Sequence, residues 1–145
     1  MARPNVAIAP ARQDRPLGVA LLAAFFAFGV AATSLSSFSL LWPGSPLEPI
    51  WRLNPRGHEG FRAMGPWAVV LLLAVGTACG GAAVGLWRGA RWGSRLAIAL
   101  LTVNAASDLI NAVHDPRTLI GLPIAAAMIV YLRGGRARRY FSQST

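Results

Sequence analysis

Asp108 is the one acidic residue inside a long apolar segment of this chain, and three uncharged polar residues share its helical face. Successive residues of a helix are about 100° apart, so the spacing predicts a single polar stripe formed by Asn104, Ser107, Asp108 and Asn111. A lipid-facing carboxylate at the bilayer centre would cost roughly 2.5–3.5 kcal/mol. We therefore expect the stripe to face other helices. It could bind a proton, a cation or a small polar ligand, or it could form hydrogen bonds that fix helix packing.

Other polar residues are expected at the same depth. The outer half of the first apolar segment is rich in hydroxyl side chains, including Ser34 and Ser37, and Arg117 stands near the start of the fourth. The first and third segments would run in the same direction through a membrane. This predicts a polar pocket in the outer half of a helix bundle, closed by apolar residues in the inner half.

Signals for catalysis or metal binding are weak. His58-Glu59 and His114-Asp115 could offer metal ligands, but adjacent residues do not face one another, and Asp115 before Pro116 is better explained as a helix cap. No known enzyme motif is present. Cys79 stands alone, so an internal disulfide is excluded. We expect no metal and no cofactor, and we favour a protein that is not an enzyme.

The composition indicates lipid as the solvent. Hydrophobic residues make up 54% of the 145-residue chain and charged residues 13%, whereas soluble domains carry about 25% charged residues. All the basic residues are arginine, and the net charge is +9. The arginines lie in short clusters between apolar blocks, as the flanking charges of membrane helices do, so nucleic-acid binding is not expected.

The apolar blocks predict an all-α fold, a bundle of four transmembrane helices over residues 17–133. The expected spans are 17–42, 65–87, 92–113 and 116–132. Residues 1–16 are expected to be a disordered tail and residues 134–145 a basic tail. A signal peptide is the alternative for the first span, but its apolar run is too long for one. In the first outer loop, Trp51 is expected to anchor a short segment at the membrane interface.

Arginine and tryptophan positions predict how the chain lies in a membrane. Ten arginines fall in the N-terminal tail, the second loop and the C-terminal tail, and four fall on the other side. Because positive charge stays in the cytoplasm, both termini are expected to be cytoplasmic. Four tryptophans mark the ends of spans, as aromatic belts do: Trp42, Trp67, Trp87 and Trp92.

The second span is rich in glycine. Two small-residue motifs lie on nearly opposite faces of this helix, Gly76 with Gly80 and Gly81 with Gly85. Small residues let helix backbones approach closely. We expect this helix to pack between two neighbours; self-association of the protein through these glycines is the alternative.

One pattern resembles a known group of proteins. The run from Trp87 to Arg95, the stripe of Asn104, Asp108 and Asn111, and the segments 119–124 and 131–133 look like a group of small uncharacterised bacterial four-helix membrane proteins. The resemblance covers roughly residues 40–141 and implies the fold and the inner membrane, but no activity. The size is also similar to that of small multidrug exporters, whose pattern has a glutamate in the first helix that this chain lacks.

The first hypothesis is an accessory subunit of a membrane assembly or a small homo-oligomer; the second is a binding or transport protein built around Asp108.

Overall fold

The computed structural model describes residues 16–113 and 116–142, with the backbone alone for Arg117 and Arg136. Every regular element among these residues is helical. The elements are α1 (Leu17–Leu41), η1 (Glu48–Leu53), α2 (Pro55–Met64), α3 (Pro66–Trp87), α4 (Arg91–Asn111), η2 (Pro116–Ile120), α5 (Gly121–Arg133) and α6 (Gly135–Ser142). The predicted N-terminal tail, except for Pro16, lies outside the described residues. The predicted helix cap at Asp115 also lies outside them.

The all-α prediction is confirmed, and the long helices begin and end close to the predicted bounds. α1, α3 and α4 correspond to the first three predicted spans. The fourth predicted span is divided, because a 3₁₀ segment precedes the α-helical part. Pro123 therefore lies in the first turn of α5, where its missing N–H costs little.

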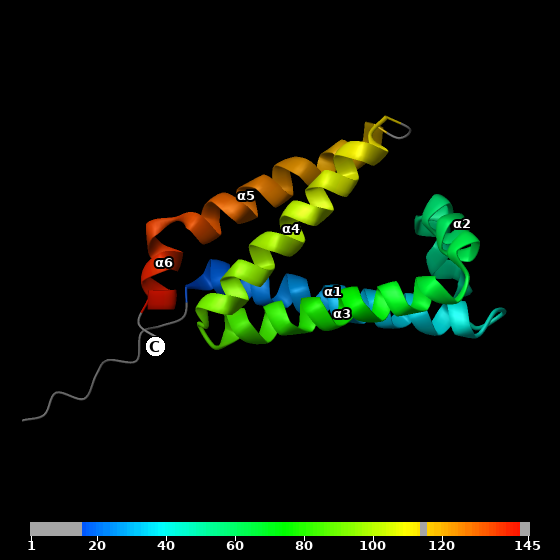
Figure 1. The fold of residues 1–145 in the computed structure, drawn as a ribbon, viewed down its shortest axis with the longest axis horizontal. Coiled ribbons are helices and arrows are strands. Elements are labelled where there is room, and N and C mark those ends of the chain that lie inside the picture. The colour runs from blue at the N-terminus through cyan, green and yellow to red at the C-terminus, as the bar shows by residue number, and fades with distance from the viewer. Residues whose placement is uncertain (1–15, 114–115, 143–145) are drawn as a thin grey trace, which may run out of the picture.

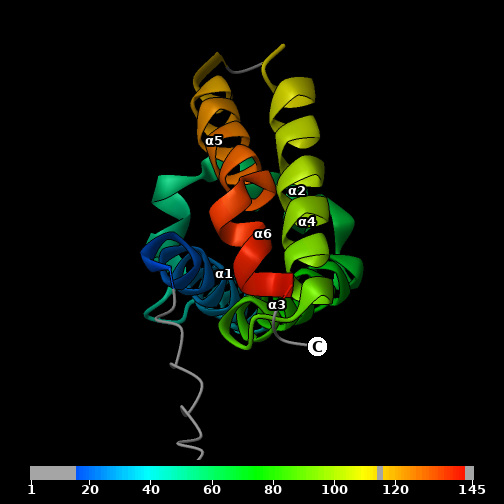
Figure 2. The same ribbon diagram turned by 90° about the vertical axis from the view of Figure 1, so that its left-hand side faces the viewer.

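The long helices form two pairs rather than one closely packed bundle. α1 packs along α3, and α4 packs along α5. Figure 1 shows the pairs meeting at one end, near α6, and diverging toward α2 at the other. In Figure 2, viewed from the side of α6, α4 and α5 stand side by side above α1 and α3. We call the end at α6 the closed end and the end at α2 the open end. The structure thus agrees with the predicted bundle in the content and order of its helices. The long helices, however, pack as two separate pairs.

α3 joins the two pairs, as its glycines predicted. A Cβ atom on Gly76 would lie 2.7 Å from the Thr33 hydroxyl of α1, and one on Gly85 would lie 2.5 Å from the Cα atom of Gly93 in α4. Gly80 faces Val30 of α1, and Gly81 faces Leu96 of α4. The expectation that this helix packs between two neighbours is confirmed, with one glycine motif on each.

The turn between α3 and α4 is fixed by local hydrogen bonds. Gly89, at φ 71°, donates from its N–H to the carbonyl of Leu86 (3.1 Å), and the next N–H, of Ala90, reaches the carbonyl of Gly85 (2.9 Å). This is the Schellman pattern, which favours glycine in the left-handed position. It ends α3 abruptly and lets α4 begin two residues later.

The buried core is small and lies toward the closed end. Its largest fully buried side chains are Leu86, Leu132 and Val19. Many large apolar side chains point outward instead, among them Phe28 (70% exposed) and Ile110 (71% exposed). So much exposed apolar surface is unusual for a soluble monomer. α1 and α3 are each long and apolar enough to cross a membrane.

The C-terminal segment differs from its prediction. Residues 135–142 of the expected basic tail form α6, and two of its side chains are buried against the core: Ala137 and Phe141. Their spacing of four residues puts both on one face of the helix, while Arg138 and Arg139 are exposed. Arg91 also donates to the carbonyls of Phe141 and Ser142, at 3.3 Å each, and so holds the C-terminal end of α6 against α4.

Candidate functional site

The polar stripe of α4 continues the line of side chains through which this helix packs. Gly93, Ala97 and Leu101 are buried and follow one another at intervals of four residues. Extending the line by three or four residues at a time leads to Asn104, then Asp108, then Asn111. The first half of the line faces α3 near the closed end. The second half faces the region where the helix pairs diverge (Figure 1).

Hydrogen bonds connect the stripe within α4 and to the start of the next helical segment. The Asn104 amide donates to Asp108 Oδ2 (3.1 Å), and the Asn111 amide donates to the Ser107 hydroxyl (3.4 Å). The Thr118 hydroxyl donates to the backbone carbonyl of Asp108 (3.0 Å). A Cβ atom added to Gly121 would lie 3.3 Å from the Asp108 Cγ atom. The Asp108 carboxylate is therefore half-buried between α4 and α5.

The other stripe residues remain uncovered within the chain. Asn104, Ser107 and Asn111 are all exposed. Their mutual bonds leave part of the hydrogen-bonding capacity of each amide unused, because a primary amide has two donors and one carbonyl acceptor. The stripe can therefore accept and donate further hydrogen bonds.

The polar residues of α1 do not join this stripe. Ser37 is buried and donates to the carbonyl of Thr33 (2.8 Å), while Ser34 is exposed. The described parts of α1 and α4 do not pack along each other, because the two pairs diverge at this depth. The structure thus does not place Ser34 and Ser37 with Asp108 in one pocket. The side chain of Arg117 lies outside the described residues, and no ion pair joins Asp108 to a described side chain.

The open end of α1 and α3 is covered by η1 and α2. Trp51, predicted to be an interfacial anchor, is instead buried: its indole N–H donates to the Ser39 hydroxyl (3.0 Å). Its ring stacks on His58, with centroids 4.6 Å apart, and contacts Phe61. α2 begins at a cap, because the Asn54 side chain accepts from the N–H of Gly57 (2.9 Å). This cluster positions the outer segment against α1.

A hollow of about 650 Å³ lies beside this cluster and includes His58 and Glu59 in its lining. Within the described ranges, no group of three or more His, Cys, Asp or Glu side chains is arranged to hold a metal ion. His114 and Asp115 lie outside those ranges. The absence of a metal site therefore stays a prediction for the chain as a whole.

Two residues that contact Asp108 were not in the predicted site. Thr118 and Gly121 come from the segment after α4, and both meet Asp108 because α4 and α5 form a hairpin. Gly121 could have been found from the sequence. A small residue near the start of the returning helix is what close approach to a carboxylate near the end of the preceding helix requires.

A comparison of this chain with models of known protein families, with curated proteins and with solved structures found no match.

Proposed function

We propose that this chain is a non-enzymatic integral membrane protein of the bacterial inner membrane that crosses the bilayer four times. In this proposal both termini are cytoplasmic, and the protein acts as a subunit of a membrane assembly, made either with copies of itself or with another membrane protein. The observation that carries the proposal is the exposed polar stripe in the C-terminal half of α4.

The placement in a membrane is supported by surface chemistry and by the arrangement of the helices. The start of α1, the α3–α4 turn and α6 lie together at the closed end (Figure 1), as expected if helices cross four times. At 1.5 Å per residue, α4 is about 30 Å long, enough for a hydrocarbon core. The tryptophans expected at the span ends are exposed: Trp42, Trp67, Trp87 and Trp92. The arginine-rich segments of α4, α5 and α6 gather at the closed end, which we assign to the cytoplasm.

The polar stripe supports the assembly role. A polar group in hydrocarbon has no water to bind, so its unused donors and acceptors favour contact with another polar surface. Asn104, Ser107 and Asn111 are exposed within the chain. Asn104 lies seven residues inside the end of α4, or about 10 Å, where lipid tails would otherwise surround it. A neighbouring helix with polar side chains would satisfy these polar groups, at about 0.6 kcal/mol for an average interhelical hydrogen bond. Several such bonds in one contact would favour a specific partner.

The stripe is a better candidate for this contact than the glycines of α3. Gly76, Gly80, Gly81 and Gly85 all face neighbours inside the chain. A second protein using these faces would have to displace α1 or α4. We therefore place self-association, if the partner is a second copy, on α4.

A second candidate function is binding or transport of a proton, a cation or a small polar ligand at Asp108. It is favoured by the position of this carboxylate, which lies between α4 and α5 without an ion-pair partner among the described side chains. The neighbouring amide of Asn104 could act as a further ligand. This function needs the charge of Asp108, whereas the assembly role needs the exposed amides.

One set of variants separates the two functions. The assembly role predicts that the triple variant Asn104→Leu, Ser107→Leu, Asn111→Leu, purified in mild detergent, loses at least about tenfold of the co-purifying partner or dissociates to a monomer, because several interhelical bonds are removed. Mass by light scattering and identification of co-purifying proteins would measure this. Asp108→Asn should leave the assembly intact. It should abolish ligand binding or proton-linked flux only if the second candidate holds.

The matched control is Thr102→Leu. Thr102 is exposed on the opposite face of α4, and its hydroxyl bonds to the Ile98 carbonyl of the same helix (2.8 Å). The Thr102→Leu substitution removes a polar group from α4 and leaves the stripe unchanged, so the assembly should persist. A triple variant that assembles like the wild type, or a wild type that is monomeric with nothing bound, would refute the assembly role.

A further inference from the structure

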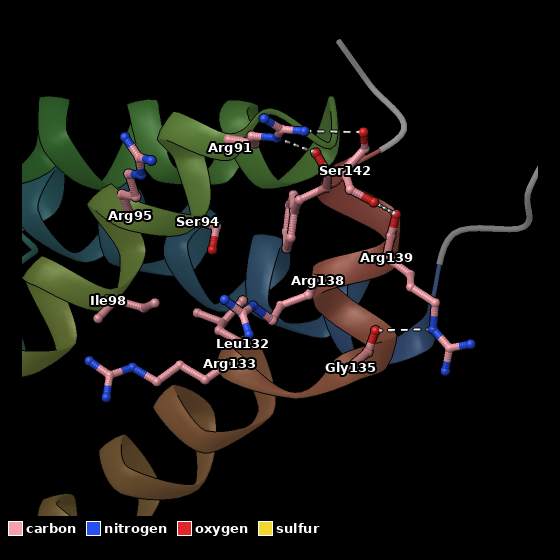
Figure 3. A pocket seen from close by; sticks show the side chains of 11 residues that line it. Arg91, Ser94, Arg95, Ile98, Leu132, Arg133, Gly135, Arg138, Arg139 and Ser142 are labelled. Carbon is pink, nitrogen blue, oxygen red and sulfur yellow. Dashed lines mark hydrogen bonds between the residues drawn. The ribbon is translucent and has the colours of Figure 1, made fainter.

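The closed end contains a second site, a cavity of about 920 Å³ between α4, α5 and α6. It is lined by five arginines and by apolar and small residues. Figure 3 shows Arg138 extending from α6 toward Leu132, with Arg95 and Arg133 across the same space on α4 and α5. The cavity thus joins the start of α4 to the consecutive helices α5 and α6, which follow it in the chain by about 30 residues or more. The buried Ala137 and Phe141 fix α6 in place to form one of its walls.

The arginines of this cavity differ in how they are held. Arg91 and Arg139 donate to backbone carbonyls, of Phe141 and Gly135 respectively, at 3.3 Å. Arg95, Arg133 and Arg138 have no hydrogen bond or ion pair with any described residue. Two arginines are therefore used to build the site, and three guanidinium groups are available to a ligand.

Among the described residues, no acidic side chain lines the cavity. Glu48 and Glu59 belong to the open end, and Asp108 is thirteen residues along α4 from Arg95, or about 20 Å at 1.5 Å per residue. Like charges that line one cavity repel one another, and an anion between them would relieve the repulsion. Guanidinium groups pair with phosphate through two parallel hydrogen bonds, so phosphate is the anion that this set of donors fits best.

The apolar part of the lining points to the source of the phosphate. Ile98, Leu132 and Phe141 border the arginines. The exposed rings of Trp87 and Trp92 lie at the same end of the molecule, and tryptophan rings of this kind mark the headgroup level of a bilayer. A phospholipid presents a phosphate beside an acyl chain at that depth, whereas free phosphate has no apolar part.

We propose that this cavity binds the headgroup of an anionic phospholipid of the cytoplasmic leaflet, with the phosphate between Arg95, Arg133 and Arg138 and the acyl chain against Ile98 and Leu132. The inference rests on the proposed membrane placement, with the closed end facing the cytoplasm. Basic cavities between membrane helices on that side are suited to anionic headgroups. The bound lipid would connect the ends of α4 and α5 with α6.

The experiment measures lipid retained by the full-length protein. Wild type and the variant Arg95→Gln, Arg133→Gln, Arg138→Gln are reconstituted in nanodiscs of phosphatidylcholine with a small fraction of phosphatidylglycerol, then released into detergent. Bound lipids are counted by native mass spectrometry. We expect one phosphatidylglycerol on the wild type and at least about tenfold weaker retention by the triple variant. Phosphatidylcholine, whose headgroup has no net charge, should not be retained.

Two controls make the result specific. Arg52→Gln, Arg56→Gln, Arg62→Gln removes the same charge from the open end, and Arg88→Gln removes one arginine from the exposed α3–α4 turn, outside the cavity lining. Both should retain the lipid. Equal loss in these controls would reduce the site to general surface charge and overturn the proposal.

Competition with inorganic phosphate distinguishes the two sources of the anion. Displacement of the lipid by millimolar phosphate would show a site for a free anion and would overturn the lipid assignment; retention supports it. A soluble chain that does not enter nanodiscs would refute the membrane placement itself. A chain that enters them but retains no anionic lipid would refute only this site.

Discussion

Replacing Gly85 by alanine is expected to force α3 and α4 apart and to lower the free energy of unfolding by about 3 kcal/mol, at the upper end of overpacking effects. The added Cβ atom would lie 2.5 Å from the Cα atom of Gly93. Both sides of this contact are backbone in rigid helices, so neither side can adjust by a change of rotamer. The contact also determines where the two helix pairs begin to diverge. Thermal unfolding of the purified protein in mild detergent measures the effect.

Gly80→Ala is the matched control in the same helix. Its Cβ atom would meet only the Val30 side chain, at 3.6 Å, which is an ordinary van der Waals distance. Alanine is also a better helix former than glycine, by roughly 0.5–1 kcal/mol. The control should therefore be neutral or slightly stabilising. Equal stability of both variants would contradict the close approach of α3 and α4.

Replacing Trp51 by alanine is expected to cost about 3 kcal/mol, the lower end of the range for removing a large buried aromatic side chain. The variant would lose the stacking on His58 and the hydrogen bond to Ser39. η1 and α2 should then separate from α1. Thermal unfolding measures the loss of stability, and faster proteolysis between Pro43 and Gly65 measures the separation.

Trp67→Ala controls for the loss of a tryptophan, because this side chain is 72% exposed at the start of α3. Its stability in detergent should stay within about 0.5 kcal/mol of the wild type, as for other surface substitutions. Ser39→Ala isolates the hydrogen bond and should cost about 1–3 kcal/mol, because it leaves the buried indole N–H without its acceptor. If Trp51→Ala were no more harmful than Trp67→Ala, the segment would be an interfacial anchor, as the sequence had suggested.

The sequence predicted those features of the fold that depend on the residues of a single helix. Apolar length predicted α1 and α3, and the opposite faces of Gly76 and Gly85 predicted contact with two neighbours, since small residues mark close helix approach. The polar stripe of α4 was found in the same way, from its periodicity. Each of these features depends only on the spacing of residues within one helix.

The angle between the helix pairs could not be predicted in this way. Periodicity says which face of α4 is turned inward, but the distance to the facing helix depends on side chains of two elements at once. Gly93 permits contact at one end, and no residue of α4 alone specifies the divergence at the other. Ser34 and Asp108 were therefore expected in one pocket, although the pairs are separate at that depth.

The packing of the segments outside the long helices could not be predicted, for two different reasons. The contact of Trp51 with Ser39 spans twelve residues, and nothing in the local sequence names the partner. In α6 the signal was present, because Ala137 and Phe141 are four residues apart, but the surrounding arginines made the segment resemble a solvated tail. The cavity that these arginines form arises only when α6 packs against α4 and α5.

The central claim is that the chain crosses the bilayer four times with the closed end inside the cell. Single cysteines, placed in a Cys79→Ala background, test it with a membrane-impermeant maleimide on intact bacterial cells. Suitable exposed positions are Glu59 and Val113 toward the open end, and Arg88 and Ser142 toward the closed end. The account predicts that cysteines at Glu59 and Val113 react on intact cells, and that those at Arg88 and Ser142 react only after the membrane is permeabilised. Labelling of Glu59→Cys together with protection of Val113→Cys, or labelling of Arg88→Cys on intact cells, would contradict it.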